Sequence, residues 1–333
     1  MIDKIELNNL NFEHRESVVY YSSPELLIQK ARPYIHIERG SEAHLLKNPV
    51  FQELNSVKAV KYNNGVVLTF GGREGLIVTD DFEYFELDQN HIVTDLYVHE
   101  DRLIFGSILG KFFHFVSFDL KTKKKVSQSQ SSQVDTLSVI KNKEKIYTLM
   151  SNSQIMCYDI ECKLLWKKFE HQYVVPGLAF YKDKLIYCAS NQIKLTNGKD
   201  TESINVPIIT IDKIEGVVGH YLYGVCGARR NLFCFDLLNK KLYYEVKIDD
   251  IIKKLLITRG KLPESEKIID ALFFSTKTHL GLVNLKNGNI QFLIQIPQIT
   301  SIQANEEIIV KTHLGESHLL RVIENEHDTI IEI

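Results

Sequence analysis

The sequence predicts an all-β protein built from many short antiparallel strands, and two observations support this prediction. First, runs of apolar, β-branched and aromatic residues recur from about residue 56 to the end, separated by turns rich in Gly, Asn, Asp and Lys. Stretches with helical period are scarce, and the best of them is a short amphipathic piece over residues 24–31. Second, the strand-like runs repeat at a regular interval.

The interval is about forty residues, the length of one supersecondary unit in repeat proteins. Alignment of the first strand of each unit on one apolar residue gives steps of 36, 41, 41, 36, 41 and 47 residues between Val60, Leu96, Leu137, Leu178, Ile214, Leu255 and Ile302. A second landmark, an aromatic or apolar residue before Asp or Asn near the end of the third strand, gives steps of 40, 77 and 48 between Asp119, Asp159, Asp236 and Asn284. The step of 77 spans two units, so both landmarks share one period.

Each unit reads as four strands. The third unit is predicted at 134–140, 145–150, 154–160 and 163–169, and the fifth at 208–214, 220–226, 231–237 and 241–247. One such sheet cannot bury both of its faces alone, whereas sheets stacked around an axis bury one another and keep only short edges. We therefore expect a seven-bladed β-propeller of four-stranded antiparallel blades over residues 56–333, with eight blades as the rival.

Residues 1–55 do not follow the same phase. They contain predicted strands at 4–7, 17–21 and 34–38, interrupted by Pro24 and Pro33. We expect this segment to form either an irregular eighth blade or an extension that closes the ring.

One stretch resembles a known family of repeats. Residues 156–169 read Met-Cys-Tyr-Asp-Ile-Glu-Cys-Lys-Leu-Leu-Trp-Lys-Lys-Phe, and 235–244 and 283–288 are weaker copies. This pattern resembles the repeat of quinoprotein-like propellers, in which an apolar-Asp-x-x-Thr-Gly turn leads into a strand ending in Trp. The Thr-Gly pair is absent and Trp166 is the only tryptophan, so we expect no quinone and no other cofactor. The Gly-His and Trp-Asp marks of WD40 repeats are also missing, and the resemblance therefore implies the WD40-like superfold and no particular subfamily.

The turns between second and third strands are the first candidate site, because in propellers they share one rim with the links between blades. Five of them carry Arg or Lys, and a ring of cations on a chain of net charge −2 would attract an acidic or phosphorylated partner. The expected rim residues are Arg73, Lys111, Arg229, Arg230, Lys277, His279, Lys311 and His313. Solvated turns with ordinary charges are the alternative interpretation.

The inner strands are the second candidate site, since residues next to the phasing positions should face the central channel. The polar residues expected to line it are Asp95, Asp135, Asp212, Lys213 and Lys254. They would form a ligand site or, as the plainer alternative, pair with one another along a water-filled shaft.

No metal site is predicted. The matching segments 277–281 and 311–315 each contain one histidine, but zinc needs three or four ligands and no Cys or carboxylate lies at a suitable spacing. The five cysteines lack Cys-x-x-Cys spacing and indicate buried free thiols in a reducing compartment. No secretory signal or membrane span is visible, so a cytoplasmic or nuclear location is expected.

No catalytic motif such as Gly-x-Ser-x-Gly, His-Glu-x-x-His or a phosphate-binding loop is present. The leading hypothesis is a non-catalytic scaffold, a subunit of a larger intracellular assembly that binds a protein partner on its rim through Arg, Lys and exposed aromatics such as Tyr173. One alternative is a non-catalytic nucleic-acid-binding subunit of a modification complex. The other is a propeller enzyme or small-ligand binder with its site in the channel.

Overall fold

The structure is a computed structural model of the chain. It describes residues 14–15, 19–22, 26–31, 34–39, 42–47, 57–63, 65–70, 75–78, 83–86, 92–109, 111–208, 210–261, 268–285, 287–296, 298–304, 308–312, 317–324 and 329–332. The regular elements of these segments are all strands, and none of the segments contains a helix long and apolar enough to span a membrane. The chain divides into two compact units, Met1–Leu46 with Val206–Ile333 (unit 1) and Lys47–Asn205 (unit 2).

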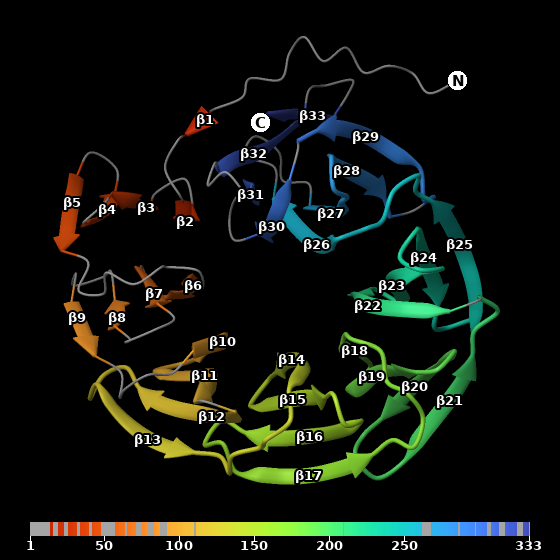
Figure 1. Cartoon of the computed structure of the whole chain (residues 1–333), viewed down its shortest axis with the longest axis horizontal. Coiled ribbons are helices and arrows are strands. Elements are labelled where there is room, and N and C mark those ends of the chain that lie inside the picture. The colour runs from red at the N-terminus through yellow and green to blue at the C-terminus, as the bar shows by residue number, and fades with distance from the viewer. Residues whose placement is uncertain are drawn as a thin grey trace. The chain divides into compact units, whose positions relative to one another are not determined.

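Unit 2 consists of four antiparallel sheets whose four strands follow one another in sequence order (Figure 1). Its strands are β6 (Val57–Tyr62), β7 (Gly65–Phe70), β8 (Gly75–Val78) and β9 (Glu83–Glu86); β10 (Ile92–His99), β11 (Arg102–Leu109), β12 (Phe112–Asp119) and β13 (Lys124–Gln128); β14 (Thr136–Asn142), β15 (Lys145–Met150), β16 (Gln154–Asp159) and β17 (Leu164–Phe169); and β18 (Ala179–Tyr181), β19 (Lys184–Ala189), β20 (Gln192–Thr196) and β21 (Thr201–Asn205).

Unit 1 also holds four sheets, one of them formed by strands from both ends of the chain. Three are four-stranded: β2 (Val19–Ser22), β3 (Leu26–Ala31), β4 (Tyr34–Arg39) and β5 (Glu42–Lys47); β22 (Ile211–Val218), β23 (Tyr221–Cys226), β24 (Asn231–Asp236) and β25 (Lys241–Lys247); and β26 (Lys254–Lys261), β27 (Ile268–Ser275), β28 (His279–Asn284) and β29 (Ile290–Gln295). The fourth sheet is five-stranded and joins β1 (His14–Arg15) to β32 (Ser317–Glu324). β32 also pairs with β31 (Ile308–Thr312) and β33 (Thr329–Glu332), and β30 (Ile299–Ala304) lies next to β31.

The all-β class and the four-stranded antiparallel sheets are as predicted, and the strands of the third and fifth units fall within a few residues of the expected ranges. The expected count of seven blades is not confirmed, because the described residues form eight sheets. The additional sheet, β2–β5, comes from residues 1–55, where β2 and β4 lie close to two of the predicted strands. The third, at 4–7, lies outside the described residues. The helical interpretation of 24–31 is wrong: β3 occupies residues 26–31, pairs with β2 and β4, and has Leu26 and Ile28 buried.

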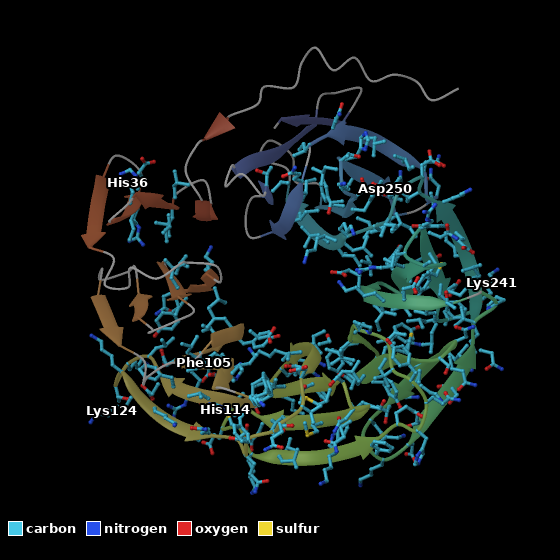
Figure 2. The ribbon with its side chains drawn as sticks, viewed as in Figure 1. His36, Phe105, His114, Lys124, Lys241 and Asp250 are labelled. Carbon is cyan, nitrogen blue, oxygen red and sulfur yellow. The ribbon has the colours of Figure 1, made fainter. Side chains whose placement is uncertain are left out.

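Apolar layers between neighbouring sheets hold each unit together. In unit 2, Phe105, Val116 and Phe118 pack with Val67 of the preceding sheet, and in unit 1 Tyr223 and Leu232 pack with Leu272 and Phe274 of the next sheet. Figure 2 shows Phe105 within its layer. Burial of one such side chain contributes about 1.5–3 kcal/mol.

The apolar residues of the first strands, whose spacing defines the forty-residue repeat, belong to these layers. Leu178, Ile214 and Leu255 are buried, and Leu96 and Leu137 pack against the layers of unit 2. The repeat therefore reflects the position at which each first strand meets the neighbouring sheet.

The recurring Asp caps the turn that leads into the fourth strand. The Oδ1 atom of Asp159 accepts hydrogen bonds from the backbone N–H groups of Glu161 (3.0 Å) and Lys163 (2.8 Å). The buried carboxylate of Asp236 does the same for Leu238 and Asn239. A short side-chain acceptor that bonds to its own turn is the mechanism by which Asp favours such positions.

The same turns contain a residue with a positive φ angle, and in two of them this residue is not glycine. Four residues after Asp119 and Asp236, Lys123 and Lys240 have φ angles of 56° and 54°, in the left-handed region that glycine adopts most easily. The corresponding residue after Asn284 is Gly288, with φ of 76°. These turns therefore adopt the conformation that glycine favours, although two of the three residues are lysines.

A bulge recurs in the fourth strand of four sheets, in β13, β17, β25 and β29. In the first three, the extra residue between the register positions of the third strand is Val126, Leu165 and Tyr243, respectively. These three side chains are 44%, 45% and 47% exposed. A β-bulge redirects the extra side chain and increases the local twist, so each of these three outer strands presents one apolar group to the outside.

Candidate partner-binding surface

Within each unit, the turn between the second and third strands lies at the same end of the sheet as the link between sheets. We call this the loop end. In unit 2, Phe113 at the start of β12 and Ser132 of the following link exchange two backbone hydrogen bonds of 2.7 Å, and Ser190 N–H donates to Tyr173 O at 2.8 Å. In unit 1, Ile252 N–H of a link donates to Arg229 O of a turn at 2.8 Å. Turn and link residues are therefore available to one partner at each loop end.

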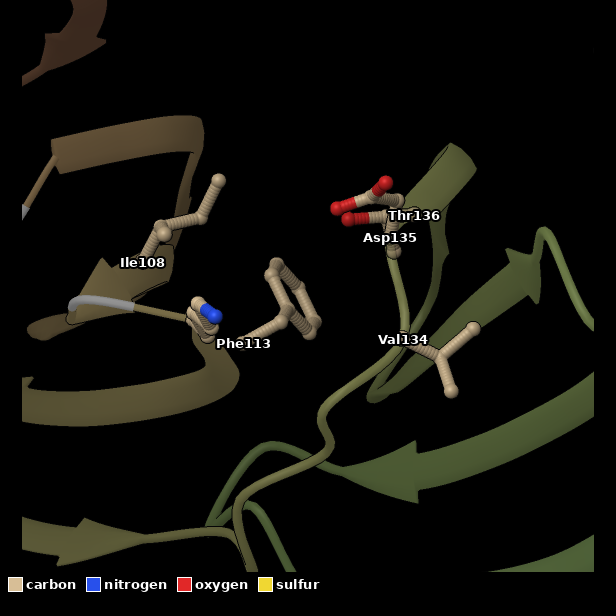
Figure 3. A pocket seen from close by; sticks show the side chains of 6 residues that line it. Ile108, Phe113, Val134, Asp135 and Thr136 are labelled. Atoms are coloured by element: carbon tan, nitrogen blue, oxygen red, sulfur yellow. The ribbon is translucent and has the colours of Figure 1, made fainter.

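A small pocket opens at the loop end between sheets β10–β13 and β14–β17 of unit 2 (Figure 3). It has a volume of about 50 Å³, enough for a group the size of one or two waters or a methyl. Its apolar walls come from Ile108, Phe113 and Val134, and Lys111 and Asp135 contribute charged groups. Lys111 was expected on the rim and Asp135 in the channel, yet both line this one pocket. Asp135 lies in the link just before β14, and its carbonyl accepts the Ser151 N–H at 2.8 Å.

Next along the same unit, an exposed aromatic row follows the end of β17. Phe169 and Tyr173 are 53% and 72% exposed, and the exposed ring of His171 lies edge-on to Phe169 at 5.2 Å between centroids. We call Phe169, His171 and Tyr173 the aromatic row. Between them Glu170 faces the protein, where its N–H donates to Ser153 O (2.9 Å) and its carboxylate accepts the hydroxyl of Tyr187 (3.0 Å). The backbone of the row is thus fixed while its rings face outward.

The loop end of sheet β22–β25 in unit 1 is cationic. Its basic turn, Gly227 to Arg230, contains three successive left-handed residues, with φ of 61°, 58° and 61° at Gly227, Ala228 and Arg229. For residues other than glycine this conformation costs of order 1 kcal/mol each and persists only where the surroundings impose it. Here the carboxylate of Asp212 accepts the Arg229 N–H at 2.7 Å. Asp212, expected in the channel, therefore supports the basic turn.

The two arginines of the basic turn differ in availability. The guanidinium of Arg229 donates to the carbonyl oxygen of Lys253 at 3.4 Å and so ties the turn to the next link. Arg230 is exposed, and its guanidinium makes no hydrogen bond or ion pair with any residue that the structure describes. Of the two arginines of the basic turn, only Arg230 has a guanidinium without a partner among the described residues.

The next turn, after β27, adds a second exposed cation. Lys277 is exposed, while its N–H donates to the carboxylate of Asp250 at 3.3 Å and its carbonyl accepts the Gln298 N–H at 2.9 Å. The hydrogen bond from the N–H of Ile251 is the main cause that lowers the pKa of Asp250, which is labelled in Figure 2. His279 is half-buried, with Nδ1 2.8 Å from the hydroxyl of Thr278.

Three other rim residues cannot be placed in full. Arg73 and His313 lie outside the described residues, and Lys311 is described only in its backbone, within β31.

A charged group missed by the sequence analysis lies on the first strand of sheet β22–β25. Lys213 Nζ is 2.7 Å from Glu215 Oε2, and both side chains are largely buried. Desolvation raises the pKa of Glu215, although Lys213 and Lys254 act in the opposite direction. Two bulges in β22, at Asp212 and Glu215, determine the directions in which the side chains of this strand point. No sequence pattern marks a bulge. Of the expected channel residues, Lys213 thus pairs with Glu215 and Lys254 acts on the same carboxylate through its charge. Asp95 lies in unit 2, opposite Gly106 after a bulge in β10.

The described residues contain no group of three His, Cys, Asp or Glu placed to hold a metal. The five cysteines are free and buried. Burial raises the pKa of Cys157 to about 11 and that of Cys226 to about 12, so both remain thiols at neutral pH and are poor nucleophiles.

The comparisons with known proteins address the fold. No family model matches the chain, and no curated protein matches its sequence. Its structure aligns with Sqt1 of Saccharomyces cerevisiae at a TM-score of 0.65 and 13% identity, over 95% of this chain and 99% of that one. The computationally designed protein Ika8 gives 0.68 and 11%, over 93% and 98%.

The WD40 repeats of RRP9 align at a TM-score of 0.54 and 8% identity, over 77% of this chain and 90% of that one. A chain of the mitotic checkpoint complex gives 0.57 and 13%, over 86% and 98%. At such identities the likeness concerns fold alone. With its repeated four-stranded antiparallel sheets, the chain has the fold of a WD40-like β-propeller.

Proposed function

We propose that the chain is a non-catalytic protein-interaction scaffold, a subunit of a larger assembly that grips a protein partner at its loop ends. The observation that carries this proposal is the aromatic row of unit 2, in which Phe169 and Tyr173 expose about half or more of their surface on a backbone fixed by hydrogen bonds. Rigid exposed aromatics supply contact area at low entropic cost and are enriched among residues that dominate binding energy. The pocket with Lys111 and Asp135 lies at the loop end of the adjoining sheet pair and would take a small side chain of the same partner.

The loop end of unit 1, taken by itself, supports a proposal about the charge of a partner segment that binds there. Arg230 and Lys277 are exposed at loop ends, and the carboxylates near them, Asp212 and Asp250, are engaged by backbone N–H groups. This arrangement supports an acidic or phosphorylated partner segment, whose association would weaken with salt. A nucleic-acid backbone would satisfy the same cations, and a gel shift at low ionic strength separates this alternative from a protein partner.

The test is co-purification of the tagged chain from its native host with matched variants. We expect Phe169→Ser with Tyr173→Ser to lose the partner, because anchor residues at an interface typically contribute 2 kcal/mol or more. The matched control is Leu164→Ser with Leu165→Ser, which changes two side chains of β17 that are 42% and 45% exposed but lie toward its other end. Loss in the control alone, or in neither variant, contradicts the proposal.

A second arm of the experiment addresses charge. Arg230→Gln with Lys277→Gln should weaken the complex and flatten its dependence on salt. Arg229 is not used, because its guanidinium and backbone hold the turn. A complex whose affinity and salt dependence are unchanged in this double variant has no acidic contact at the basic turn.

A further inference from the structure

One lysine of unit 2 directs its amine at a histidine and not at a carboxylate. Lys141 Nζ, on β14, donates to Val98 O at 2.9 Å and lies 3.4 Å from His99 Nδ1, both on β10 of the neighbouring sheet. Among the described residues no carboxylate forms an ion pair with Lys141, whereas Lys143, two residues further on, pairs with Asp183 at 3.0 Å. The amine of Lys141 is therefore placed beside a group that can accept a proton.

This lysine lies at the end of its sheet opposite the loop end. His99 and Lys141 are at the close of the first strands β10 and β14, next to the turns that lead into β11 and β15. The loop end carries the turns between second and third strands, and successive antiparallel strands reverse direction. The hydroxyl of Tyr97 donates to Val139 O at 3.1 Å and so ties the two first strands together beside the lysine. The site is thus preorganised and separate from the surface assigned to the protein partner.

Glu144, in the turn after β14, lies on the other side of the histidine. Its Oε1 atom is 4.0 Å from His99 Nε2, and a carboxylate there favours the tautomer that carries its hydrogen on Nε2. Nδ1 is then the proton-accepting nitrogen that faces Lys141. Burial also lowers the pKa of Lys141, which increases the fraction of neutral amine. A nucleophile, a base and a group that orients the base, in this order, are the arrangement that activates nucleophilic side chains.

The other carboxylates around this group affect which reagent can approach it. Glu100, in the turn after β10, is exposed. Asp101 beside it accepts the hydroxyl of Tyr62 at 2.8 Å and pairs with Lys121. Together with Glu144, Glu100 disfavours an anionic reacting group such as an acyl phosphate. The uncharged carbonyl of a thioester meets no such repulsion.

We propose that Lys141 is an acylation site that takes acyl groups from thioesters, with His99 as the base and Glu144 as the positioning residue. The Nζ lone pair attacks the thioester carbonyl carbon, and the C–N bond forms while His99 Nδ1 accepts one proton from Nζ. The C–S bond then breaks, and the thiolate that leaves takes this proton from His99. The products are an amide at Lys141 and a free thiol, so the chain is the acceptor and reacts once. The proposal is independent of the loop-end function.

Exposure alone predicts the opposite order of reactivity among the neighbouring lysines. The side chain of Lys143 is 77% exposed and that of Lys145 is also exposed, while Lys141 is half-buried. If accessibility decided the rate, Lys143 and Lys145 would react first. These two lysines are therefore internal controls in every sample.

The test incubates the full chain with N,S-diacetylcysteamine, a small acetyl thioester, and follows acetylation of each lysine by tandem mass spectrometry. We expect Lys141 to be acetylated before Lys143 and Lys145 at neutral pH. The preference should disappear in urea that unfolds the chain. It should also shrink as the pH approaches about 10.4, the ordinary pKa of lysine, because every lysine is then largely an amine.

Two variants test the roles of the histidine and the glutamate. His99→Gln keeps a hydrogen-bond acceptor but removes the base, and should slow acetylation of Lys141 about tenfold or more while Lys143 reacts as before. Glu144→Ala should slow it less, and nitrogen-15 NMR of labelled histidines should show the His99 hydrogen redistributed from Nε2 to Nδ1. Thermal unfolding checks that each variant is folded.

Two results overturn the proposal. One is acetylation of Lys143 or Lys145 ahead of Lys141 in the folded, unaltered chain, a measurement that needs no variant. The other is a rate at Lys141 that a folded His99→Gln variant leaves unchanged. An unchanged His99 tautomer in Glu144→Ala overturns the role given to Glu144.

Discussion

The loop ends of the two units offer a partner different chemistry on the same kind of sheet. In unit 2 the loop end is aromatic, and its rings are held by backbone hydrogen bonds along an extended link. In unit 1 it is cationic, and its basic turn is held in a left-handed conformation by the carboxylate of Asp212. The difference teaches that the repeat fixes the sheet and the place of its turns, while each turn is free to acquire its own side chains and its own means of support.

The difference between the two loop ends is tested most strongly by removing, one at a time, a side chain whose hydrogen bond stabilises each of them. Asp212→Ala should cost about 1.5–2 kcal/mol, because it removes a charged acceptor from a turn with strained residues. Ser153→Ala in unit 2 removes only the long 3.4 Å hydrogen bond from its hydroxyl to Gln172 O and should cost a few tenths of a kcal/mol. Urea unfolding of both variants measures the contrast, and equal losses would show that the basic turn does not rely on Asp212.

A smaller effect concerns pH within unit 1, where two carboxyl groups shift in opposite directions. The N–H of Ile251 lowers the pKa of Asp250 below its ordinary value of 3.8, so its stabilisation is present above that pH and is lost as pH falls through the folded pKa. Desolvation raises the pKa of Glu215 above 4.5, so its stabilisation is present below that pH and is lost as pH rises through the folded pKa.

Urea midpoints measured from pH 3 to 7 should therefore diverge for two isosteric variants. Asp250→Asn should fall further behind the unaltered chain as pH rises from the folded pKa of Asp250 to about 3.8 and should keep a constant deficit above that pH, while Glu215→Gln should gain on the unaltered chain as pH rises above about 4.5. Parallel curves for the two variants would contradict the opposite shifts.

The smallest effect should be the same in both units, because it concerns the shared backbone. Lys123→Gly in unit 2 and Lys240→Gly in unit 1 relieve a left-handed side-chain-bearing residue and should each raise the free energy of unfolding by about 0.5–1 kcal/mol. Lys241→Gly, one residue further into a strand, is the control and should lower it by a similar amount. A loss of stability at both turns would indicate that the lysine side chains, and not the backbone, stabilise them.

Much of the fold could be predicted from the sequence because its signals are local. The apolar period records where each first strand meets the next sheet, and the recurring Asp records a turn that must be capped, so strands such as β15 and β25 fall on their predicted ranges. The additional sheet was expected only as one of two alternatives, an irregular eighth blade or an extension, because residues 1–55 lack that phase. The pairing of His14 with His318 joins residues too distant in sequence for any local pattern to encode.

The candidate site was less predictable, because side-chain partners depend on packing and on bulges. Lys111 and Asp135 were both singled out, but the pocket that they share depends on how a turn approaches a link. Arg229 reads in the sequence as one more free cation, although its backbone and side chain hold a turn together. Glu215 was missed because a bulge, not the alternation of the strand, determines where it points.

The bulges of the outer strands also affect whether these strands can pair with strands of other molecules. A flat outermost strand presents a regular row of N–H and C=O groups on which a foreign strand can assemble. At Val126, Leu165 and Tyr243 the extra residue interrupts that row. Deletion of any one of them should restore an even spacing, and the resulting regular edge should pair more readily with a strand from another molecule.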